Sequence, residues 1–228
     1  MKKQNKKIVV LLLIVAIGLC AALAGSFNTE SIATKSAKKQ EYYTSANESK
    51  DDVIYMSDLD YITDNNWSYN GWSGHSIQKD KNPEGGTISL LVNGSKKIFI
   101  KGMGVHANGQ VTYDISDTSA IYTRFIGKVG VDSSRGTNGS VKFKFLVSND
   151  GENWNELLTT DVLKGNSESV DVDLDIANYK YFRIFVDRSI NGNSADHGVI
   201  AIAKFVKTDY SNSGLVEYDK LKNTEYYD

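Results

Sequence analysis

The chain has 228 residues, a formal net charge of −2 and a single cysteine. This length suits one domain of medium size with appended segments. Without the four lysines of an N-terminal leader, 22 basic residues face 28 acidic ones, which argues against nucleic acid or an anionic membrane surface as the main partner. Cys20 lies within the leader, so the rest of the chain has no disulfide and no thiol nucleophile. Core burial or a bound ion must stabilise its fold.

The first 24 residues differ sharply from the rest of the chain. A basic head with four lysines precedes an almost wholly apolar run at residues 8–23. Ala22-Leu23-Ala24 supplies a small-x-small cleavage site, so the layout is typical of a secretory signal peptide. An uncleaved N-terminal membrane anchor is the alternative, because the run is close to the shortest length that spans a bilayer. Both interpretations predict that the remainder lies outside the cytoplasm, either secreted or tethered at the cell surface.

Two polar segments flank the part of the chain that can build a core. Residues 25–52 are rich in Ser, Thr, Lys, Glu and Gln and are predicted to form a linker. Residues 209–228 carry tyrosines among polar residues and are predicted to form a C-terminal tail. The folded domain is therefore expected at residues 53–208.

From Val53 onward the pattern is that of short β-strands separated by turns. Asn93-Gly94 between two apolar runs is a strong hairpin signal. Strands are expected at residues 53–56, 87–92, 97–100, 110–115, 122–131, 139–148, 154–160, 170–176, 181–186 and 199–206. Many short strands, a single proline and no long helical period predict an all-β domain built as an antiparallel β-sandwich.

Residues 101–115 place one histidine, His106, among small residues in a strand-like run. Gly102, Gly104 and Gly109 would allow another backbone or a ligand to approach closely. Small neighbours around one polar ring suit a shallow recognition site. A core histidine with satisfied hydrogen bonds is the alternative.

An aromatic loop carries Trp67, Tyr69 and Trp72 among Asn and Gly residues. Indole faces stack on the apolar faces of sugars and on cations. The alternative is that one tryptophan closes the bottom of the sandwich. We expect Trp72 to be buried in part and Trp67 to be more exposed, because tryptophan is seldom wholly buried or wholly exposed.

Two polar loops follow expected strands. In the first, residues 132–139, Asp132 and Arg135 offer an acceptor and a planar donor fork. An ordinary polar loop is the alternative, because turn chemistry selects the same residues. The second loop ends in Asp196-His197, and a histidine beside an aspartate at the same rim favours a binding role.

Catalytic motifs are missing from the sequence. It contains no Gly-x-Ser-x-Gly, no His-Glu-x-x-His and no phosphate-binding glycine loop. His75, His106 and His197 lack paired ligand spacing, which disfavours a transition-metal site. A glycosidase needs two opposed carboxylates, whereas most acidic residues here alternate on strand faces. The sequence therefore predicts a protein that is not an enzyme, with a cryptic hydrolase as a further alternative.

Calcium is the ion that the loop residues would suit. Asp58, Asp60, Asp64 and Asp80 are candidate donors, because Ca²⁺ prefers hard oxygen ligands. There is no EF-hand spacing. We expect any such ion to be structural and to replace the missing disulfides.

Several runs occur in the order found in one known family. They are Tyr55-Met-Ser-Asp-Leu-Asp60, Asn70-Gly-Trp72, Lys79-Asp80, Lys101-Gly-Met-Gly-Val-His-Ala107, Tyr113-Asp114, Gly130-Val-Asp132, Gly136, Asn138-Gly-Ser-Val141, Gly151, Val170-Asp-Val172 and Asp196-His197. Over residues 53–207 the chain resembles the NPCBM/NEW2 domain, a carbohydrate-binding module related to family 51. The resemblance implies a galactose-binding-domain-like jelly-roll sandwich that binds terminal sugars, often galactosides. Such domains are usually joined to a bacterial glycoside hydrolase.

The predicted function is therefore that of a non-catalytic carbohydrate-binding module. The predicted sugar contacts are His106, Asn108, Asp132, Arg135, Asp196 and His197, with Trp67 or Trp72 as a stacking face. The chain departs from the family pattern at Ser133, where a second Asp is usual, and at Gly198-Val199-Ile200, where Ala-Asp-Trp is usual. These departures motivate the alternative that the sandwich has lost sugar binding and holds a protein partner or the cell envelope.

Overall fold

The computed structural model describes residues 42–45, 48, 51–189, 192, 194–211 and 215–217. The chain divides into two units, Met1–Lys39 and Gln40–Asp228, and all the described residues belong to the second. The predicted signal peptide or anchor, much of the predicted linker and the end of the predicted tail lie outside these ranges. Within them, no helix is long and apolar enough to cross a membrane.

The described residues form β-strands and three short 3-10 helices. The strands are β1 (Tyr42–Ser45), β2 (Val53–Tyr55), β3 (Gln78–Lys79), β4 (Ile88–Val92), β5 (Ser95–Phe99), β6 (Gly102–His106), β7 (Gly109–Asp114), β8 (Arg124–Val131), β9 (Ser140–Ser148), β10 (Asn155–Thr159), β11 (Leu163–Lys164), β12 (Val170–Asp175), β13 (Tyr181–Arg188), β14 (His197–Val206) and β15 (Leu215–Glu217). The 3-10 helices are η2 (Met56–Asp58), η3 (Asp64–Asn66) and η4 (Ser133–Arg135). The hairpin prediction is confirmed, since Asn93 and Gly94 join β4 to β5 with φ of 52° and 71°, both positive as a type I′ turn requires.

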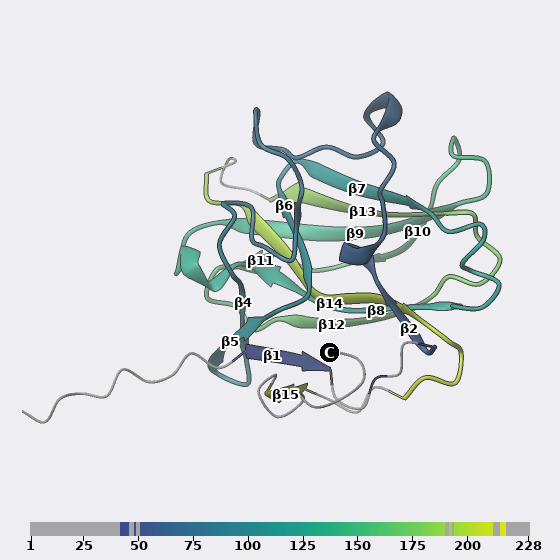
Figure 1. Cartoon of the computed structure of the whole chain (residues 1–228). Coiled ribbons are helices and arrows are strands. Elements are labelled where there is room, and N and C mark those ends of the chain that lie inside the picture. Colours follow the sequence, from purple (N-terminus) through teal and green to yellow (C-terminus); the bar gives the residue numbers. More distant parts are fainter. Residues whose placement is uncertain are drawn as a thin grey trace, which may run out of the picture. The chain divides into compact units, whose positions relative to one another are not determined.

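Two antiparallel sheets form the predicted sandwich. One has the order β10-β9-β13-β7, with β11 also paired to β9, and the other has the order β12-β8-β14-β6-β3, with β2 paired to β14. Figure 1 shows β7, β13, β9 and β10 in one layer and β14, β8 and β12 in the next. The core between them is aromatic at its centre, where the Phe125 ring lies 4.8 Å from Phe182 and 5.6 Å from Phe145. The all-β sandwich fold is confirmed.

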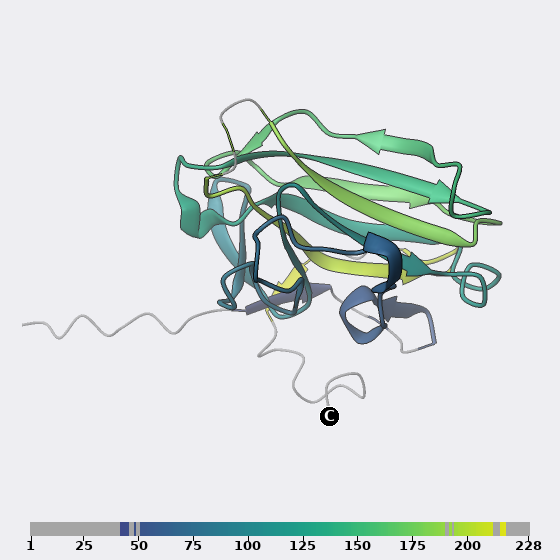
Figure 2. The same cartoon turned by 90° about the horizontal axis from the view of Figure 1, so that it is seen from above.

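A third, smaller sheet packs on the other side of the second one. Its order is β15-β1-β5-β4, and β1 runs parallel to β5 and antiparallel to β15. A second core contains Leu90 and Phe99 from this sheet with Val199 and Ala201 from β14. Figure 2 shows β14 with the green strands on one side and the blue β1 on the other. Because β14 is covered on both faces, it reads as a nearly continuous apolar run.

The segments that flank the predicted domain contribute to this arrangement. β1 and Glu48 come from the predicted linker, and β15 comes from the predicted tail. The ammonium of Lys204, which is fully buried, pairs with Glu48 and donates to the Tyr210 hydroxyl at 2.9 Å. The Tyr55 hydroxyl also donates to Glu48, at 2.5 Å. The folded unit therefore extends beyond residues 53–208 on both sides.

Glycines in β6 let neighbouring backbone come close, as predicted from the sequence. A Cβ atom on Gly104 would lie 2.4 Å from the carbonyl oxygen of Lys81. One on Gly102, where φ is +150°, would lie 2.3 Å from the carbonyl oxygen of Ile200. At these two positions the approaching group is main chain, which draws the segment before β4 and the strand β14 onto β6.

Candidate functional site

Three neighbouring strands, β6, β14 and β8, bring polar side chains to one edge of the second sheet. His106 is the last residue of β6 and pairs directly with His197, the first residue of β14. The two rings lie 5.1 Å apart. On the other side of β14, the Asp132 amide at the end of β8 donates to the His197 carbonyl at 2.9 Å. The chain then enters η4, which carries Arg135 to the same edge.

The loop that carries Trp72 lies against the end of β6. The Gly71 amide donates to the His106 carbonyl at 3.0 Å, and a Cβ atom on Gly71 would lie 2.3 Å from the carbonyl carbon of Ala107. The Asn70 side-chain oxygen accepts from the amides of both His106 and Trp72, at 3.1 Å each. Only glycine fits at residue 71, and the contact sets the indole beside the two histidines.

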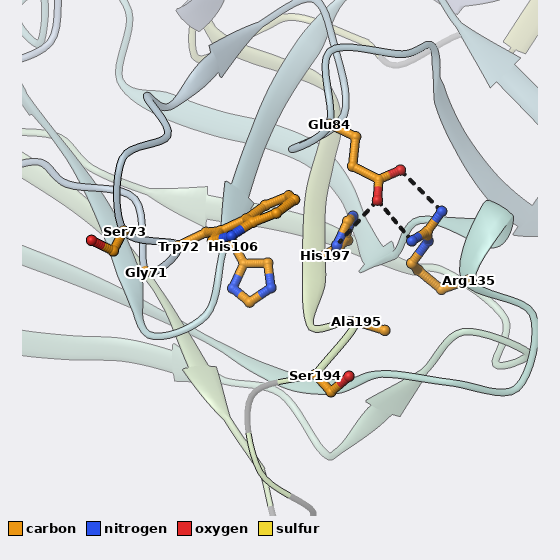
Figure 3. A pocket seen from close by; sticks show the side chains of 9 residues that line it. All are labelled: Gly71, Trp72, Ser73, Glu84, His106, Arg135, Ser194, Ala195 and His197. Carbon is orange, nitrogen blue, oxygen red and sulfur yellow. Dashed lines mark hydrogen bonds and ion pairs between the residues drawn. The ribbon is translucent and has the colours of Figure 1, made fainter.

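These elements enclose a cavity of about 500 Å³. It is lined by Gly71, Trp72, Ser73, Glu84, His106, Arg135, Ser194, Ala195 and His197, which Figure 3 shows together. The indole of Trp72 lies 5.6 Å from the His106 ring and 5.9 Å from the His197 ring, and it stacks on His75 at 3.7 Å. Of the predicted contacts, Trp72, His106, Arg135 and His197 therefore meet in one cavity.

Arg135 enters the cavity with a carboxylate partner. Its Nη1 and Nη2 atoms donate to the two oxygens of Glu84 at 2.9 and 3.0 Å, a bidentate pair marked in Figure 3. Sequence reasoning missed Glu84. Its loop is held by Asn82, whose side-chain oxygen accepts from the amides of Glu84 and Gly86. The turn residues around Glu84 mark a loop, but they give no sign of the arginine it meets.

The ring of His106 is oriented by the main chain. Its Nδ1 atom lies 2.6 Å from the carbonyl oxygen of Ala107. Because a carbonyl only accepts, Nδ1 carries the proton and donates. In its neutral form the ring therefore keeps Nε2 as a hydrogen-bond acceptor.

The ring of His197 is held neutral by its surroundings. Burial lowers the pKa of His197 to about 4, and the positive charge of Arg135 acts in the same direction, whereas Glu84 opposes the shift. Nε2 lies 4.0 Å from a Glu84 oxygen, which is too long for a hydrogen bond. Nδ1 is buried and has no partner among the described groups. At neutral pH, His197 thus contributes polar atoms to the cavity without a charge.

Asp132 and Asp196 lie behind the cavity wall. Both are fully buried, and neither lines the cavity. Asp132 accepts from the Ser89 amide at 2.9 Å and from the Ser134 amide at 3.0 Å, which caps η4. Asp196 accepts from the Ser140 amide at 2.7 Å, and burial raises its pKa. The structure places both as supports of the site.

The structure places two other predicted contacts outside the cavity. The side-chain oxygen of Asn108 accepts from the Arg188 amide at 2.8 Å. Trp67 packs edge-on against Tyr181 at 5.0 Å and against Trp154 at 6.0 Å, on the five-stranded sheet. Both tryptophans of the aromatic loop are partly buried, but only Trp72 lines the cavity.

Lysines accompany three of the four predicted calcium donors. The Lys101 ammonium lies 2.5 Å from Asp58 and 3.2 Å from Asp80, and Lys79 lies 3.3 Å from Asp60. Over the residues that the structure describes, no group of three or more His, Cys, Asp or Glu side chains is arranged to hold a metal ion. These carboxylates already have positive partners.

The sequence between residues 52 and 206 matches the family model described as the NPCBM/NEW2 domain. The chain belongs to this family. The predicted resemblance is confirmed. No curated protein matches the chain.

Solved structures similar to this NPCBM/NEW2 domain are family 51 carbohydrate-binding modules (CBM51). The CBM51 from Clostridium perfringens GH95, in complex with methyl-galactose, is 28% identical with a TM-score of 0.60, over 68% of this chain and 99% of that chain. The CBM51-2 and INT domains from Clostridium perfringens ZmpB are 32% identical with a TM-score of 0.59, over 71% of this chain and 33% of that chain. The tandem CBM51 modules of Streptococcus pneumoniae Sp3GH98, a family 98 glycoside hydrolase, are 25% identical with a TM-score of 0.58, over 68% of this chain and 47% of that chain. The chain thus spans nearly all of the first and less than half of the other two.

The departures from the NPCBM/NEW2 pattern fall at residues that do not line the cavity. Val199 and Ile200, at the usual Asp and Trp positions, are fully buried in the second and first cores. The Ser133 hydroxyl donates to the Ser89 hydroxyl at 2.8 Å. None of the three residues lines the cavity, so their substitution leaves its walls intact.

Proposed function

We propose that this NPCBM/NEW2 domain is a non-catalytic carbohydrate-binding module, and that the cavity beside His106 binds the terminal sugar of a glycan, such as a galactoside. The observation that carries the proposal is the lining of the cavity. One concave site of about 500 Å³ combines an indole, two imidazoles and a paired guanidinium and carboxylate. Ligand sites of this size typically pair an apolar wall with a few convergent polar groups.

The lining matches the chemistry of a sugar. Each sugar hydroxyl both donates and accepts, so it needs a site that offers both. Glu84 and the Nε2 atom of a neutral His106 accept, and the remaining Nη hydrogens of Arg135 donate. The Trp72 indole supplies an apolar surface for the C–H groups of a pyranose ring. Because Glu84 neutralises Arg135, the site suits a neutral ligand.

The CBM51 structures support this class of ligand. One relative was solved with methyl-galactose, and another, 29% identical with a TM-score of 0.59, was solved with GlcNAc. Both belong to a family of carbohydrate-binding modules. We therefore propose a sugar ligand for this chain, with galactosides as the first to be tested.

A non-catalytic role is supported by the carboxylates of the site. Among the described residues that line the cavity, Glu84 alone carries a carboxylate, and both of its oxygens accept from Arg135. Glycoside hydrolysis needs two opposed carboxylates. We expect the chain to release no chromophore from a panel of chromogenic glycosides. Release by the wild type that is lost in the Glu84→Gln variant would contradict a pure binding role.

We further propose that the domain acts outside the cytoplasm, secreted or tethered by its N-terminal segment. The basic head, the apolar run and the Ala-x-Ala site of the leader support export. The mass of the exported chain separates the two forms, because cleavage after Ala24 removes the leader and an anchor retains it. A chain found only in the cytoplasm would contradict the proposal.

Binding is tested with a glycan array followed by calorimetry. The wild-type chain is compared with His106→Ala, Arg135→Ala and a control, Lys164→Ala, which changes an exposed residue of β11. We expect the first two variants to weaken binding at least tenfold and the control to bind as the wild type does.

Two results would count against the proposal. One is the absence of binding to any glycan, and the other is binding that is indifferent to both cavity substitutions. A pull-down that enriches one protein in the presence of free sugars would favour the alternative of a protein-binding sandwich.

A further inference from the structure

A second cluster of aromatic and cationic side chains lies on the outer face of the five-stranded sheet, away from the cavity. We call it the sheet-face cluster, and it consists of Trp67, Tyr69, Trp154, Tyr181 and Arg183. Trp67 and Tyr69 belong to the same aromatic loop as Trp72. Of these three aromatic residues, Trp72 alone lines the cavity, so the proposed sugar site gives no role to Trp67 and Tyr69.

Strand periodicity directs Arg183 outward. Its neighbours in β13, Phe182 and Ile184, are fully buried in the core between the two large sheets. Alternate residues of a strand face opposite sides, so Arg183 lies on the outer face. There it is flanked by Leu146 of β9 and Thr112 of β7, its direct partners across the sheet.

Neighbouring turns hold the two tryptophans in place. The indole nitrogen of Trp154 donates to the Gly151 carbonyl at 3.1 Å. Trp67 packs onto the same glycine, where a Cβ atom would lie 2.3 Å from its ring. The Trp67 carbonyl accepts from the Gln110 side chain at 3.1 Å. Both rings are therefore positioned before any ligand arrives.

The guanidinium of Arg183 packs over the Trp154 ring and lies beside Trp67. Its central carbon is 3.7 Å from the Trp154 ring centroid and 5.7 Å from the Trp67 centroid. Nε donates to the Thr112 hydroxyl at 2.9 Å. Burial lowers the pKa of Arg183, with a smaller opposing influence from Tyr69. The cation is thus partly removed from water.

Arg183 has no carboxylate partner in the part of the chain that the structure describes, and its Nη atoms donate to no protein group there. By contrast, Arg124 pairs with Asp173, and Arg135 pairs with Glu84. A partly desolvated charge is costly unless an opposite charge or several hydrogen bonds compensate it. Stacking on indoles supplies some compensation, but it leaves the Nη hydrogens free.

An exposed aromatic ring completes the cluster. Tyr69 is 39% exposed, and among the described residues Ile121 is the one other large hydrophobic side chain that is exposed. Tyr69 pairs with Gln110 of β7 in an isolated bridge, and Gln110 in turn pairs with Phe185, two residues after Arg183 on the same face of β13. An exposed aromatic beside free, planar donors offers both the stacking surface and the anchor that a charged sugar requires.

We propose that the sheet-face cluster is a second carbohydrate-binding site, which takes a sugar residue bearing a carboxylate, such as a uronic acid. The Nη atoms of Arg183 donate to the two carboxylate oxygens, the bidentate geometry for which guanidinium is suited. Tyr69 and the edge of Trp67 contact the sugar ring. Charge complementarity selects an acidic sugar over a neutral one, because Arg183 is a cation without a carboxylate partner among the described residues.

The two sites lie apart on the domain. Arg188, whose amide donates to the side chain of Asn108, two residues after the cavity residue His106, is five residues after Arg183 in β13. At the ordinary rise of a strand this separation is about 16 Å. The sheet-face site does not depend on the proposed sugar site, and either can fail without the other.

The test uses cellobiouronic acid and cellobiose, which differ by a carboxylate in place of a hydroxymethyl group. Calorimetry with the full chain is expected to show at least tenfold tighter binding of the acid. Arg183→Gln is expected to remove this difference, and Arg183→Lys to keep only part of it. Tyr69→Ala is expected to weaken binding several-fold without unfolding the chain, because the ring is exposed. His106→Ala serves as the matched control and is expected to leave binding of the acid unchanged.

Three outcomes would overturn the proposal. One is equal binding of acid and neutral sugar by the wild type. Another is an Arg183→Gln variant with a lower melting temperature and undiminished binding of the acid, which would make the stack purely structural. The third is loss of acid binding on His106→Ala, which would locate the ligand in the cavity. If circular dichroism shows that Arg183→Gln does not fold, the binding of the acid by Tyr69→Ala and Arg183→Lys tests the proposal instead.

Discussion

Arg135 and Arg183 are both partly buried guanidinium groups in sites that contain tryptophan, yet their electrostatic surroundings are opposite. Arg135 lines a cavity and pairs bidentately with Glu84. Arg183 lies on the outer face of a sheet beside two indoles, and the described part of the chain supplies it with no carboxylate. The charge of Arg135 is therefore balanced within its site, whereas the charge of Arg183 is not balanced by any described carboxylate.

The difference shows what sets the ligand class of an arginine site. An internal carboxylate cancels the charge and leaves single hydrogen bonds, which favour uncharged hydroxyl groups. An unpaired guanidinium retains a full charge in partly desolvated surroundings, which favours an anion. Substitutions and changes of solvent at either site can test this contrast.

The largest effect is expected from the glycines that support each site. Gly71→Ala places a Cβ atom 2.3 Å from the backbone of Ala107, so main chain must move. We expect a loss of about 3 kcal/mol in the free energy of unfolding, with loss of cavity binding. Gly151 has φ of +76°, and Gly151→Ala places a Cβ atom 2.3 Å from the Trp67 ring. We expect this variant to lose about 2 kcal/mol in the free energy of unfolding and to lose binding at the sheet-face cluster.

Urea denaturation and calorimetry on both variants measure these effects. Each variant is the control for the other, since each should spare the site it does not touch. A smaller loss of stability for Gly71→Ala than for Gly151→Ala would contradict the assignment of a backbone clash to the cavity.

Lowering the pH is expected to reduce the stability of the fold through His197, which lines the cavity. The pKa of His197 is about 4 in the folded chain, below its ordinary value near 6.5. Between these values the unfolded chain binds a proton that the folded chain does not, so stability is complete above pH 6.5 and falls as the pH drops to 4. The loss attributable to His197 is on the order of 3 kcal/mol.

The pH dependence of His197→Gln isolates this contribution. Asp196, whose pKa is raised, contributes in the opposite direction, and it is common to both chains. We expect urea titrations from pH 7 to 4 to show a shallower fall for the variant. Parallel pH profiles of the two chains would contradict a buried neutral histidine.

Removing the internal carboxylate should make the cavity resemble the sheet face. Glu84→Gln keeps the shape of the side chain but leaves Arg135 with a neutral partner. We expect galactoside binding to weaken about tenfold, or about 1.4 kcal/mol, and binding of an acidic sugar to the cavity to appear. Glycan-array profiles of this variant in an Arg183→Gln background measure the change without the second site. An unchanged preference for neutral sugars would show that Glu84 does not set the ligand class.

The smallest effect is expected from salt. Raising NaCl from 0.05 to about 0.5 M screens a partly exposed charge pair but hardly affects hydrogen bonds to a neutral ligand. We expect cellobiouronic acid to bind a few-fold more weakly at high salt and galactoside binding to change little. Calorimetry at both salt concentrations compares the two sites in one protein. An equal salt dependence of both ligands would contradict the contrast between Arg135 and Arg183.

Much of the sandwich could be predicted because its strands carry their own pattern. Residues 140–148 alternate between the core and the surface, and Asn93-Gly94 permits a turn of only a few types. β1 and β15 could not be predicted, because short polar strands at the edge of a sheet are stabilised by backbone hydrogen bonds that any side chain allows. Their place depends on the β4–β5 hairpin that they extend.

The candidate site was only partly predictable for a related reason. His106 is marked by its own glycine neighbours, and a local signal of that kind survives in sequence. Glu84 meets Arg135 across 51 residues, and nothing near either residue records the pairing. Asp132 has the side chain of a ligand contact, but burial behind η4 makes it a cap.

The family, the strand pattern and one histidine that lines the cavity can be read from the amino-acid sequence alone, because each depends on residues that are close together in the chain. Which charges have partners, and which aromatic rings share a site, depends on the tertiary structure. Trp67 and Trp72 are five residues apart, yet one packs on a sheet face and the other lines a cavity. Contacts between distant segments are set by the folding of the sheets, and these contacts give two arginines of the same chain opposite electrostatic surroundings.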